Sequence, residues 1–242
     1  MTACMGSQSF YPSLSQASGG GSIVKFSNCV CMVAAALAMM LVVAASEEIS
    51  MTADQALKNL MDGNARFVSG QAIRPNQGSD RLAEVVGGQH PFAVLVGCSD
   101  SRIPPEIIFD QGIGDIFVIR TAGQVIDDVA LGSIEYAVEH LGVKLVMVLG
   151  HDSCGAVKAT VDGGEAPGHI GSLVKSISPA VEAARSDGNL SVLDQAIDIN
   201  VRNIVEQIKG SGPILSHEVA DGKIGVVGAR YNLSSGAVHL VD

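Results

Sequence analysis

Four short apolar runs, separated by segments with helical spacing, govern the fold that this sequence can adopt. They are Phe92–Val96, Ile116–Ile119, Val143–Leu149 and Ile224–Ala229. Because almost every position in these runs is apolar, both faces of each predicted strand should be buried. The sequence therefore predicts an α/β fold with a central mostly parallel β-sheet flanked by helices.

Helical spacing of apolar residues predicts the elements between the strands. Thr52, followed three residues later by Gln55, is a capping-box signature and predicts an amphipathic helix over 51–68. The chain should end in a hairpin over 231–241 that turns at Ser234-Ser235-Gly236. Further helices are expected at 81–86, 129–141, 170–185 and 192–209.

Charge is distributed unevenly along the 242 residues. Residues 1–46 contain one base, Lys25, and no acid, so all 25 acids face 14 of the 15 bases in 47–242, which carries a net charge of −11. This acidic balance argues against a phosphate-binding surface and excludes a nucleic-acid partner. The five cysteines are too few and too scattered for a disulfide scaffold.

An unbroken apolar run over 29–45 separates an N-terminal leader from the rest of the chain. Its 17 residues are typical of an export signal, with Val43 and Ala45 at the −3 and −1 positions of a cleavage site. A spanning helix needs about 20 apolar residues, so an uncleaved anchor is the second interpretation. A misplaced start codon, an organelle transit segment or a cloning scar would also account for it. We expect a leader over 1–45 and a single domain over 46–242.

The leader also determines the predicted location of the protein. A signal peptide would send the domain to a periplasm, a lumen or the outside of the cell, and without one the domain is cytoplasmic. The leader is the only part of the chain that predicts contact with a membrane.

Two loops that directly follow predicted strands carry candidate metal ligands. Cys98 and Asp100 follow the first strand, and His151 and Cys154 follow the third. Carboxyl ends of parallel strands meet at one edge of a sheet, so these side chains should lie together. Two thiolates, an imidazole and an oxygen form a tetrahedral zinc set. The alternatives are buried structural residues, or a disulfide between the two cysteines in an oxidising compartment.

With these residues in place, the chain resembles the β-class carbonic anhydrases from about Gln89 to Thr160, and more loosely over 51–242. The segments that carry the resemblance are CSDSRIPPEIIFDQGIGDIFVIRTAG, GSIEYAVEHLGV and VLGHDSCGAVKA. The resemblance implies one zinc per chain and reversible hydration of carbon dioxide to bicarbonate and a proton by attack of zinc-bound hydroxide. It also implies a homodimer or homotetramer in which the first helix crosses onto a neighbouring subunit.

The resemblance assigns roles in the metal site residue by residue. Cys98, His151 and Cys154 hold the zinc, and Asp100 alternates with water at the fourth position. Arg102 draws Asp100 away from the metal by forming an ion pair with it. Asp100 and Arg102 are therefore the expected catalytic pair.

The resemblance also implies a substrate pocket formed by Gln89, Phe117, Tyr136 and Gly155. Gln89 matches a glutamine that binds bicarbonate, often across a subunit interface, and Gly155 matches a backbone position beside a metal ligand. From the residues alone, Phe117 and Tyr136 are predicted core residues, and this is the favoured interpretation of the Tyr136 ring.

Some members of this family bind bicarbonate at a second, inhibitory site formed by a Trp, an Arg and a Tyr. The matching positions here are Leu95, Arg120 and Tyr231, and the sequence contains no Trp. We therefore expect weak or absent regulation of this kind.

Two other functions fit the same residues. The zinc site could hydrolyse carbon disulfide or a similar small molecule, or it could be purely structural in a protein for assembly or bicarbonate sensing. A structural zinc site keeps four protein ligands. An arginine that draws one of these ligands away from the metal would have no role in such a site. Arg102 therefore favours the enzyme.

Overall fold

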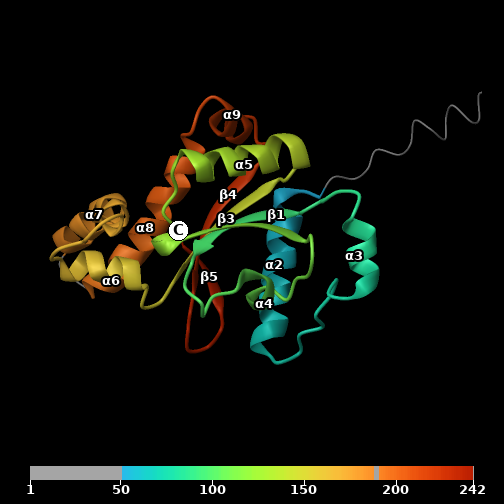
Figure 1. Cartoon of the computed structure of the whole chain (residues 1–242), viewed down its shortest axis with the longest axis horizontal. Helices are drawn as coiled ribbons and strands as arrows, with labels where there is room; N and C mark the ends of the chain where they lie inside the picture. The colour runs from blue at the N-terminus through green and yellow to red at the C-terminus, as the bar shows by residue number, and fades with distance from the viewer. Residues whose placement is uncertain (1–50, 188–190, 242) are drawn as a thin grey trace, which may run out of the picture. The chain divides into compact units, whose positions relative to one another are not determined.

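The computed structural model describes residues 51–187 and 191–241 (Figure 1). The predicted leader and its cleavage site lie outside these residues. Five strands form one sheet in the order β2-β1-β3-β4-β5. Strands β1 to β4 are parallel, and β5 is antiparallel to β4. The predicted α/β class with a central, mostly parallel sheet is confirmed.

All predicted strands are present, and several extend past their predicted ends. Their bounds are β1 Ala93–Cys98, β2 Ile116–Thr121, β3 Leu145–His151, β4 Gly225–Tyr231 and β5 Val238–Val241. Cys98 and His151 are thus the last residues of their strands. One expectation is wrong: β2 is half-buried along most of its length, because it lies at the edge of the sheet.

The five predicted helices are also present, and three short ones are additional. The bounds are α2 Ala53–Val68, α3 Ser79–Val85, α4 Pro105–Ile108, α5 Asp128–Leu141, α6 Gly155–Asp162, α7 Ile170–Asp187, α8 Val192–Lys209 and α9 Ile214–Ala220, with a 3₁₀ turn over Ala122–Gln124. The Thr52–Gln55 capping box forms as predicted. Three of the four short helices, α4, α6 and α9, were not predicted, since one or two helical turns show little periodicity.

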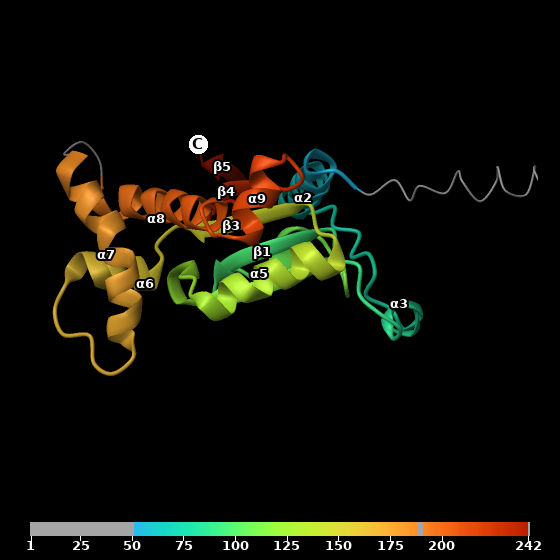
Figure 2. The same cartoon turned by 90° about the horizontal axis from the view of Figure 1, so that it is seen from above.

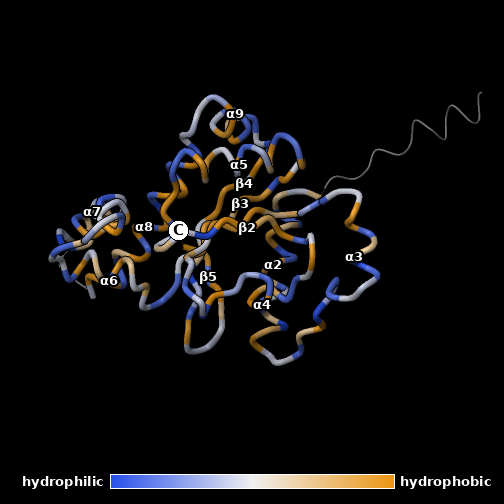
Figure 3. The backbone as a smooth tube through the Cα atoms, in the orientation of Figure 1, coloured by the Kyte–Doolittle hydropathy of each residue, from blue (hydrophilic) through white to orange (hydrophobic). Residues whose placement is uncertain are grey.

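The sheet separates two apolar cores, because side chains alternate between its faces. Leu95 and Met147 belong to the core under α2 and α7, whereas Val96 and Val148 belong to the core under α5. Helix α5 runs alongside β1 on the second face (Figure 2). The hydropathy colouring shows the same concentration of apolar residues in the central strands (Figure 3).

Helix α8 approaches the sheet closely at two glycines, Gly150 next to the carboxyl end of β3 and Gly228 in the middle of β4. A Cβ on Gly150 would lie 2.5 Å from Val201, and one on Gly228 would lie 2.7 Å from the same side chain. Both distances are too short for a side chain of any size. The glycines therefore permit the helix to pack where β3 reaches His151.

Buried Asn64 joins α2 to the rest of the chain. Its Nδ2 donates to the carbonyl oxygens of Ile108 (3.1 Å) and Gly236 (2.9 Å), and its Oδ1 accepts from the N–H of Val238 (2.9 Å). One side chain thus holds α4 and the predicted hairpin turn against α2. Within the described ranges, no helix is long and apolar enough to cross a membrane.

Candidate metal centre

Three predicted ligands meet at the carboxyl edge of the sheet. Cys98 ends β1, His151 ends the neighbouring strand β3, and Cys154 directly precedes α6. One ligand atom from each residue lies within 4.8 Å of the others, and all three residues are buried. The parallel register of β1 and β3 brings these residues together although 52 residues separate Cys98 from His151. Both thiols are free, so the disulfide alternative is wrong.

Backbone groups orient two of the ligands. The N–H of Gly123 donates to Cys98 Sγ at 3.2 Å, and the carbonyl oxygen of Asp152 lies 2.8 Å from His151 Nδ1. Because a carbonyl oxygen can only accept, we assign the ring proton to Nδ1, which leaves a lone pair on Nε2. His151 Nε2 is buried and has no hydrogen-bond partner within the described part of the chain. This orphaned acceptor fits a metal ligand.

The two thiols also favour a bound cation. Hydrogen bonding from the Cys154 thiol lowers the pKa of Cys98, and the same contact, together with burial, raises the pKa of Cys154. One thiolate therefore forms readily, and a second would place two negative charges side by side. A divalent cation removes this repulsion, and a Cys-His-Cys set is typical of zinc.

Asp100 lies beside this cluster but is held by Arg102. The guanidinium donates from Nε to Oδ1 (2.9 Å) and from Nη2 to Oδ2 (2.7 Å). Asp100 Oδ2 is 3.9 Å from His151 Nε2. The Arg102 side chain holds the pKa of Asp100 well below its usual range, so the carboxylate stays ionised. The structure thus shows the predicted pair in contact at the edge of the metal cluster.

Arg120 has a contact that the sequence did not predict. From β2 it donates to the carbonyl oxygens of Cys98 (2.9 Å) and Asp100 (2.6 Å) and so holds the backbone of the metal loop. This contact could have been predicted only from the pairing of β1 with β2, in which Thr121 lies beside Cys98. The other two positions of the inhibitory pocket are buried: Leu95 packs in the apolar core, and burial raises the pKa of Tyr231.

Of the four predicted substrate residues, Gly155 alone is next to the cluster in the sequence and in the fold. It is the first residue of α6, and a Cβ there would meet no atom within 4 Å. Gln89 precedes β1 and so lies toward the end of the strand opposite Cys98.

The two aromatic positions also lie away from the metal loop of their own chain. Phe117 pairs with Val94, four positions before the end of the β1–β2 ladder, and packs against the core under α5. Tyr136 is 48% exposed on α5, with its ring 5.1 Å from that of His140. The interpretation of Tyr136 as a core residue is therefore wrong, because it lies on the outer side of the helix.

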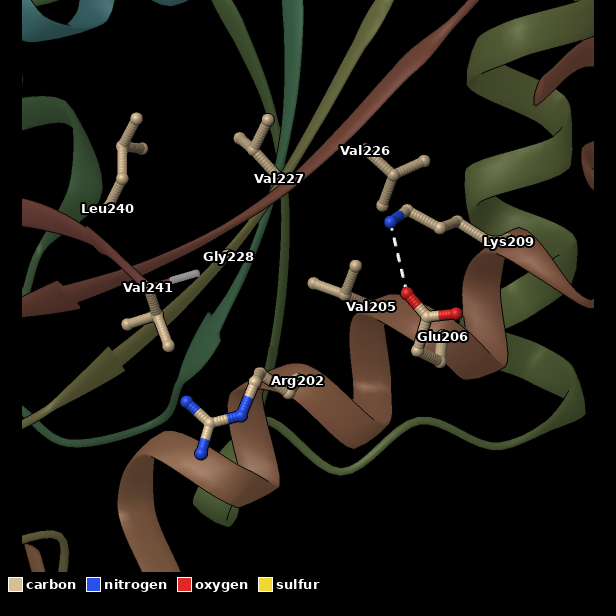
Figure 4. A pocket seen from close by; sticks show the side chains of 9 residues that line it. All are labelled: Arg202, Val205, Glu206, Lys209, Val226, Val227, Gly228, Leu240 and Val241. Atoms are coloured by element: carbon tan, nitrogen blue, oxygen red, sulfur yellow. Dashed lines mark hydrogen bonds and ion pairs between the residues drawn. The ribbon is translucent and has the colours of Figure 1, made fainter. Parts of the chain in front are cut away.

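A separate groove lies between α8 and strands β4 and β5 (Figure 4). It has a volume of about 310 Å³, and a 3.0 Å ion pair between Lys209 and Glu206 lies at its edge. None of the predicted site residues lines it. The candidate chemistry therefore belongs to the carboxyl edge of β1 and β3.

The fold and the site together define a class: an α/β protein with a buried Cys-His-Cys cluster that could hold a metal ion at the carboxyl edge of a parallel sheet. Comparisons with known proteins agree. The family model described as carbonic anhydrase matches residues 93–238. The chain is 48% identical over 189 residues to a carbonic anhydrase of Mycolicibacterium smegmatis, covering 76% of this chain and 91% of the relative. It is 46% identical to carbonic anhydrase 2 of Mycobacterium tuberculosis H37Rv, covering 77% and 92%.

Solved structures show the same class. A β-carbonic anhydrase from Coccomyxa, in complex with acetazolamide, superposes with a TM-score of 0.60 at 27% identity, covering 76% of this chain and 86% of that chain. A tetrameric β-carbonic anhydrase from Sordaria macrospora gives 0.60 at 25%, covering 74% and 93%. The chain therefore belongs to the carbonic anhydrase family, in its β class. It catalyses the reversible hydration of carbon dioxide, and the non-catalytic alternative is set aside.

Proposed function

We propose that carbon dioxide hydration in this chain uses one zinc ion held by Cys98, His151 and Cys154. The observation that carries the proposal is the buried His151 Nε2, which lies beside two thiols and accepts no hydrogen bond from any of the described residues. When bound, zinc lowers the pKa of a coordinated water to about 7 and so supplies a nucleophile at neutral pH.

Asp100 and Arg102 supply the groups that position the reacting water. The bidentate contact keeps Asp100 ionised and holds its carboxylate against Arg102. The ionised carboxylate accepts a hydrogen bond from the water and so orients a lone pair toward carbon dioxide. Gly155 leaves open space beside Cys154, where a small substrate can approach.

Zinc content and the rate of hydration test this proposal together. We expect one zinc per chain by elemental analysis and fast proton release on mixing with carbon dioxide. Asp100→Asn should keep its zinc and lose about 10²-fold in kcat, because a misoriented reacting group costs a factor of this order. Asp128→Asn, at the exposed start of α5, is the matched control and should behave as the wild type.

Two results would contradict the proposal. A folded protein that binds no zinc would show that Cys98, His151 and Cys154 do not form a zinc site. A zinc-loaded Asp100→Asn variant with wild-type kcat would remove Asp100 from the catalytic pair.

We also propose that the enzyme is a homodimer or homotetramer in which a second copy completes the substrate pocket. Gln89 precedes β1, and the whole strand separates it from Cys98, so we expect it to reach a metal site only in a neighbouring copy. Large apolar side chains are exposed near it, including Val86 at 85%. The similar enzyme from Sordaria macrospora is tetrameric.

Subunit mixing tests whether sites are shared. Gln89→Ala and Cys98→Ser should each lower activity strongly when purified alone. Mixed after dissociation and reassembly, they should recover part of the activity, because one copy supplies the metal and the other the glutamine. No recovery from a verified mixed oligomer would show that Gln89 does not act across an interface.

We further propose that residues 1–45 export the domain 46–242. The apolar run over 29–45 and the small residues at Val43 and Ala45 support this. The mass of the protein from its native cells should correspond to a chain that begins at Ser46. A cytoplasmic protein that begins at Met1 would contradict export.

A further inference from the structure

The orientation of the His151 ring depends on one backbone carbonyl. Nδ1 donates to the carbonyl oxygen of Asp152 at 2.8 Å, and the ring is fully buried, so water does not provide a substitute. The direction of this carbonyl follows the backbone of Asp152 itself. Whatever holds Asp152 therefore sets where Nε2 points.

Asp152 is held at two points on the neighbouring strand β4. Its N–H donates to the carbonyl oxygen of Tyr231 at 3.1 Å, and its Oδ1 accepts from Arg230 Nε at 2.6 Å. The next residue, Ser153, has φ +52°, a left-handed conformation that costs energy in a residue other than glycine. The loop between the two metal ligands therefore needs these contacts to keep its shape.

Arg230 is in turn fixed by α8. Nη2 contacts Asp194 Oδ1 at 2.7 Å and Nη1 contacts Asp198 Oδ1 at 3.2 Å, from positions one helical turn apart. A hollow of about 620 Å³ borders these side chains, so solvent can reach Asp152 once the guanidinium is removed. The planar guanidinium of Arg230 thus contacts three carboxylates at once. The single ammonium group of a lysine could not reproduce this arrangement.

We propose that Arg230 is a positioning residue for the metal centre: by holding Asp152, it fixes the ring of His151 so that Nε2 faces the metal. The inference rests on the zinc site proposed above. Partners that orient a metal-ligating histidine through its second nitrogen commonly contribute 10- to 100-fold to metal affinity.

Zinc affinity of the purified protein, measured by competition with a chelator, tests the inference. Arg230→Met should bind zinc about 10- to 100-fold more weakly than the wild type, and Arg230→Lys should recover part of this loss. The matched control is Arg66→Met, which removes another 2.6 Å contact between an arginine Nε and a carboxylate, on α2. It should lower stability and leave zinc affinity unchanged.

A spectroscopic measurement separates positioning from general loosening of the fold. With Co²⁺ in place of zinc, the visible absorption bands report on ligand geometry. They should shift in Arg230→Met and keep their wild-type positions in Arg66→Met. If Arg230→Met does not fold, as judged by circular dichroism, Asp152→Asn should show the same shift because it weakens the same contact.

The outcomes distinguish this inference from the proposed function. A wild-type protein that binds no zinc would remove the zinc assignment and this inference with it. A wild type that binds zinc, with Arg230→Met of equal affinity and unchanged cobalt bands, would overturn the role of Arg230 alone. An equal loss of affinity in Arg66→Met would also overturn it, because the effect would then be general.

Discussion

A single buried charged residue can link several segments of the described domain. Asp110, away from the metal cluster, is an example. Its side chain is 1% exposed and accepts from Arg66 Nε at 2.6 Å. Two backbone groups, the N–H of Ile73 and of Arg74, also donate to it. Burial opposes ionisation of this group, but the contacts from Arg66 and the two N–H groups outweigh it and lower the pKa of Asp110.

The lowered pKa predicts how stability depends on pH. A carboxyl with a lower pKa in the folded state stabilises the protein above its unfolded pKa, about 3.9, and loses this effect as pH falls through the folded value. Asp110→Asn should therefore lower the free energy of unfolding at pH 7 by about 1–3 kcal/mol. The difference from the wild type should shrink as the pH falls from 5 toward 2.

Urea unfolding at several pH values measures this difference. Asp128→Asn, on the exposed start of α5, controls for the loss of a charge. A difference between Asp110→Asn and the wild type that stays constant from pH 7 to pH 2 would contradict the assignment of a lowered pKa.

At the scale of elements, the packing of α8 on β3 and β4 depends on the absence of side chains at two positions. Val201 of α8 fills the space above Gly150 and Gly228. Because Val201 is β-branched, it has little freedom to turn away. Gly150 also directly precedes His151, so this contact determines how closely α8 packs on the sheet beside the metal cluster.

Gly150→Ala should therefore destabilise the fold. The added Cβ would lie 2.5 Å from Val201, and overpacking of this kind costs about 1–3 kcal/mol. Gly132→Ala is the matched control, because it lies on the exposed side of α5 with open space, and alanine is favoured over glycine by about 1 kcal/mol in a helix. Thermal unfolding should show a lower Tm for the first variant and an equal or higher Tm for the second. The reverse order would show that α8 does not pack closely at Gly150.

At the scale of the whole described domain, the proposed zinc would cross-link elements that already lie side by side at one edge of the sheet. Its proposed ligands come from the ends of β1 and β3 and from the start of α6. A ligand that binds only the folded state stabilises it by a free energy that grows with the logarithm of its excess over Kd. Removal of zinc by a chelator should therefore lower the Tm.

The expected effect of zinc is about 4 kcal/mol when free zinc is a thousandfold above Kd. Differential scanning calorimetry with zinc, and with a chelator in its place, measures it. Cys154→Ser should respond far less to the chelator, and magnesium should not replace zinc because it prefers oxygen ligands. A wild-type Tm that does not change on removal of a bound zinc would show that the metal does not hold these elements together.

The strands, the long helices and the cluster of Cys98, His151 and Cys154 could be predicted from local patterns. Helical spacing and the capping box at Thr52 depend on residues a few positions apart, and the apolar runs depend on adjacent ones. The juxtaposition of these three residues was predictable because parallel neighbouring strands must end at the same edge. Three of the four short helices, α4, α6 and α9, were not, since one or two helical turns carry little periodicity.

Contacts between distant segments could be assigned only from the tertiary structure. The edge position of β2, the exposure of Tyr136 and the contacts of Arg120 with the metal loop follow from register and helix packing. So does the contact between Arg230 and Asp152, two residues that are 78 positions apart. Hydrophobic patterning acts locally and selects which face of an element is buried. Which elements pack against one another depends on how all the buried faces fit together at once. No local pattern in the sequence encodes this fit.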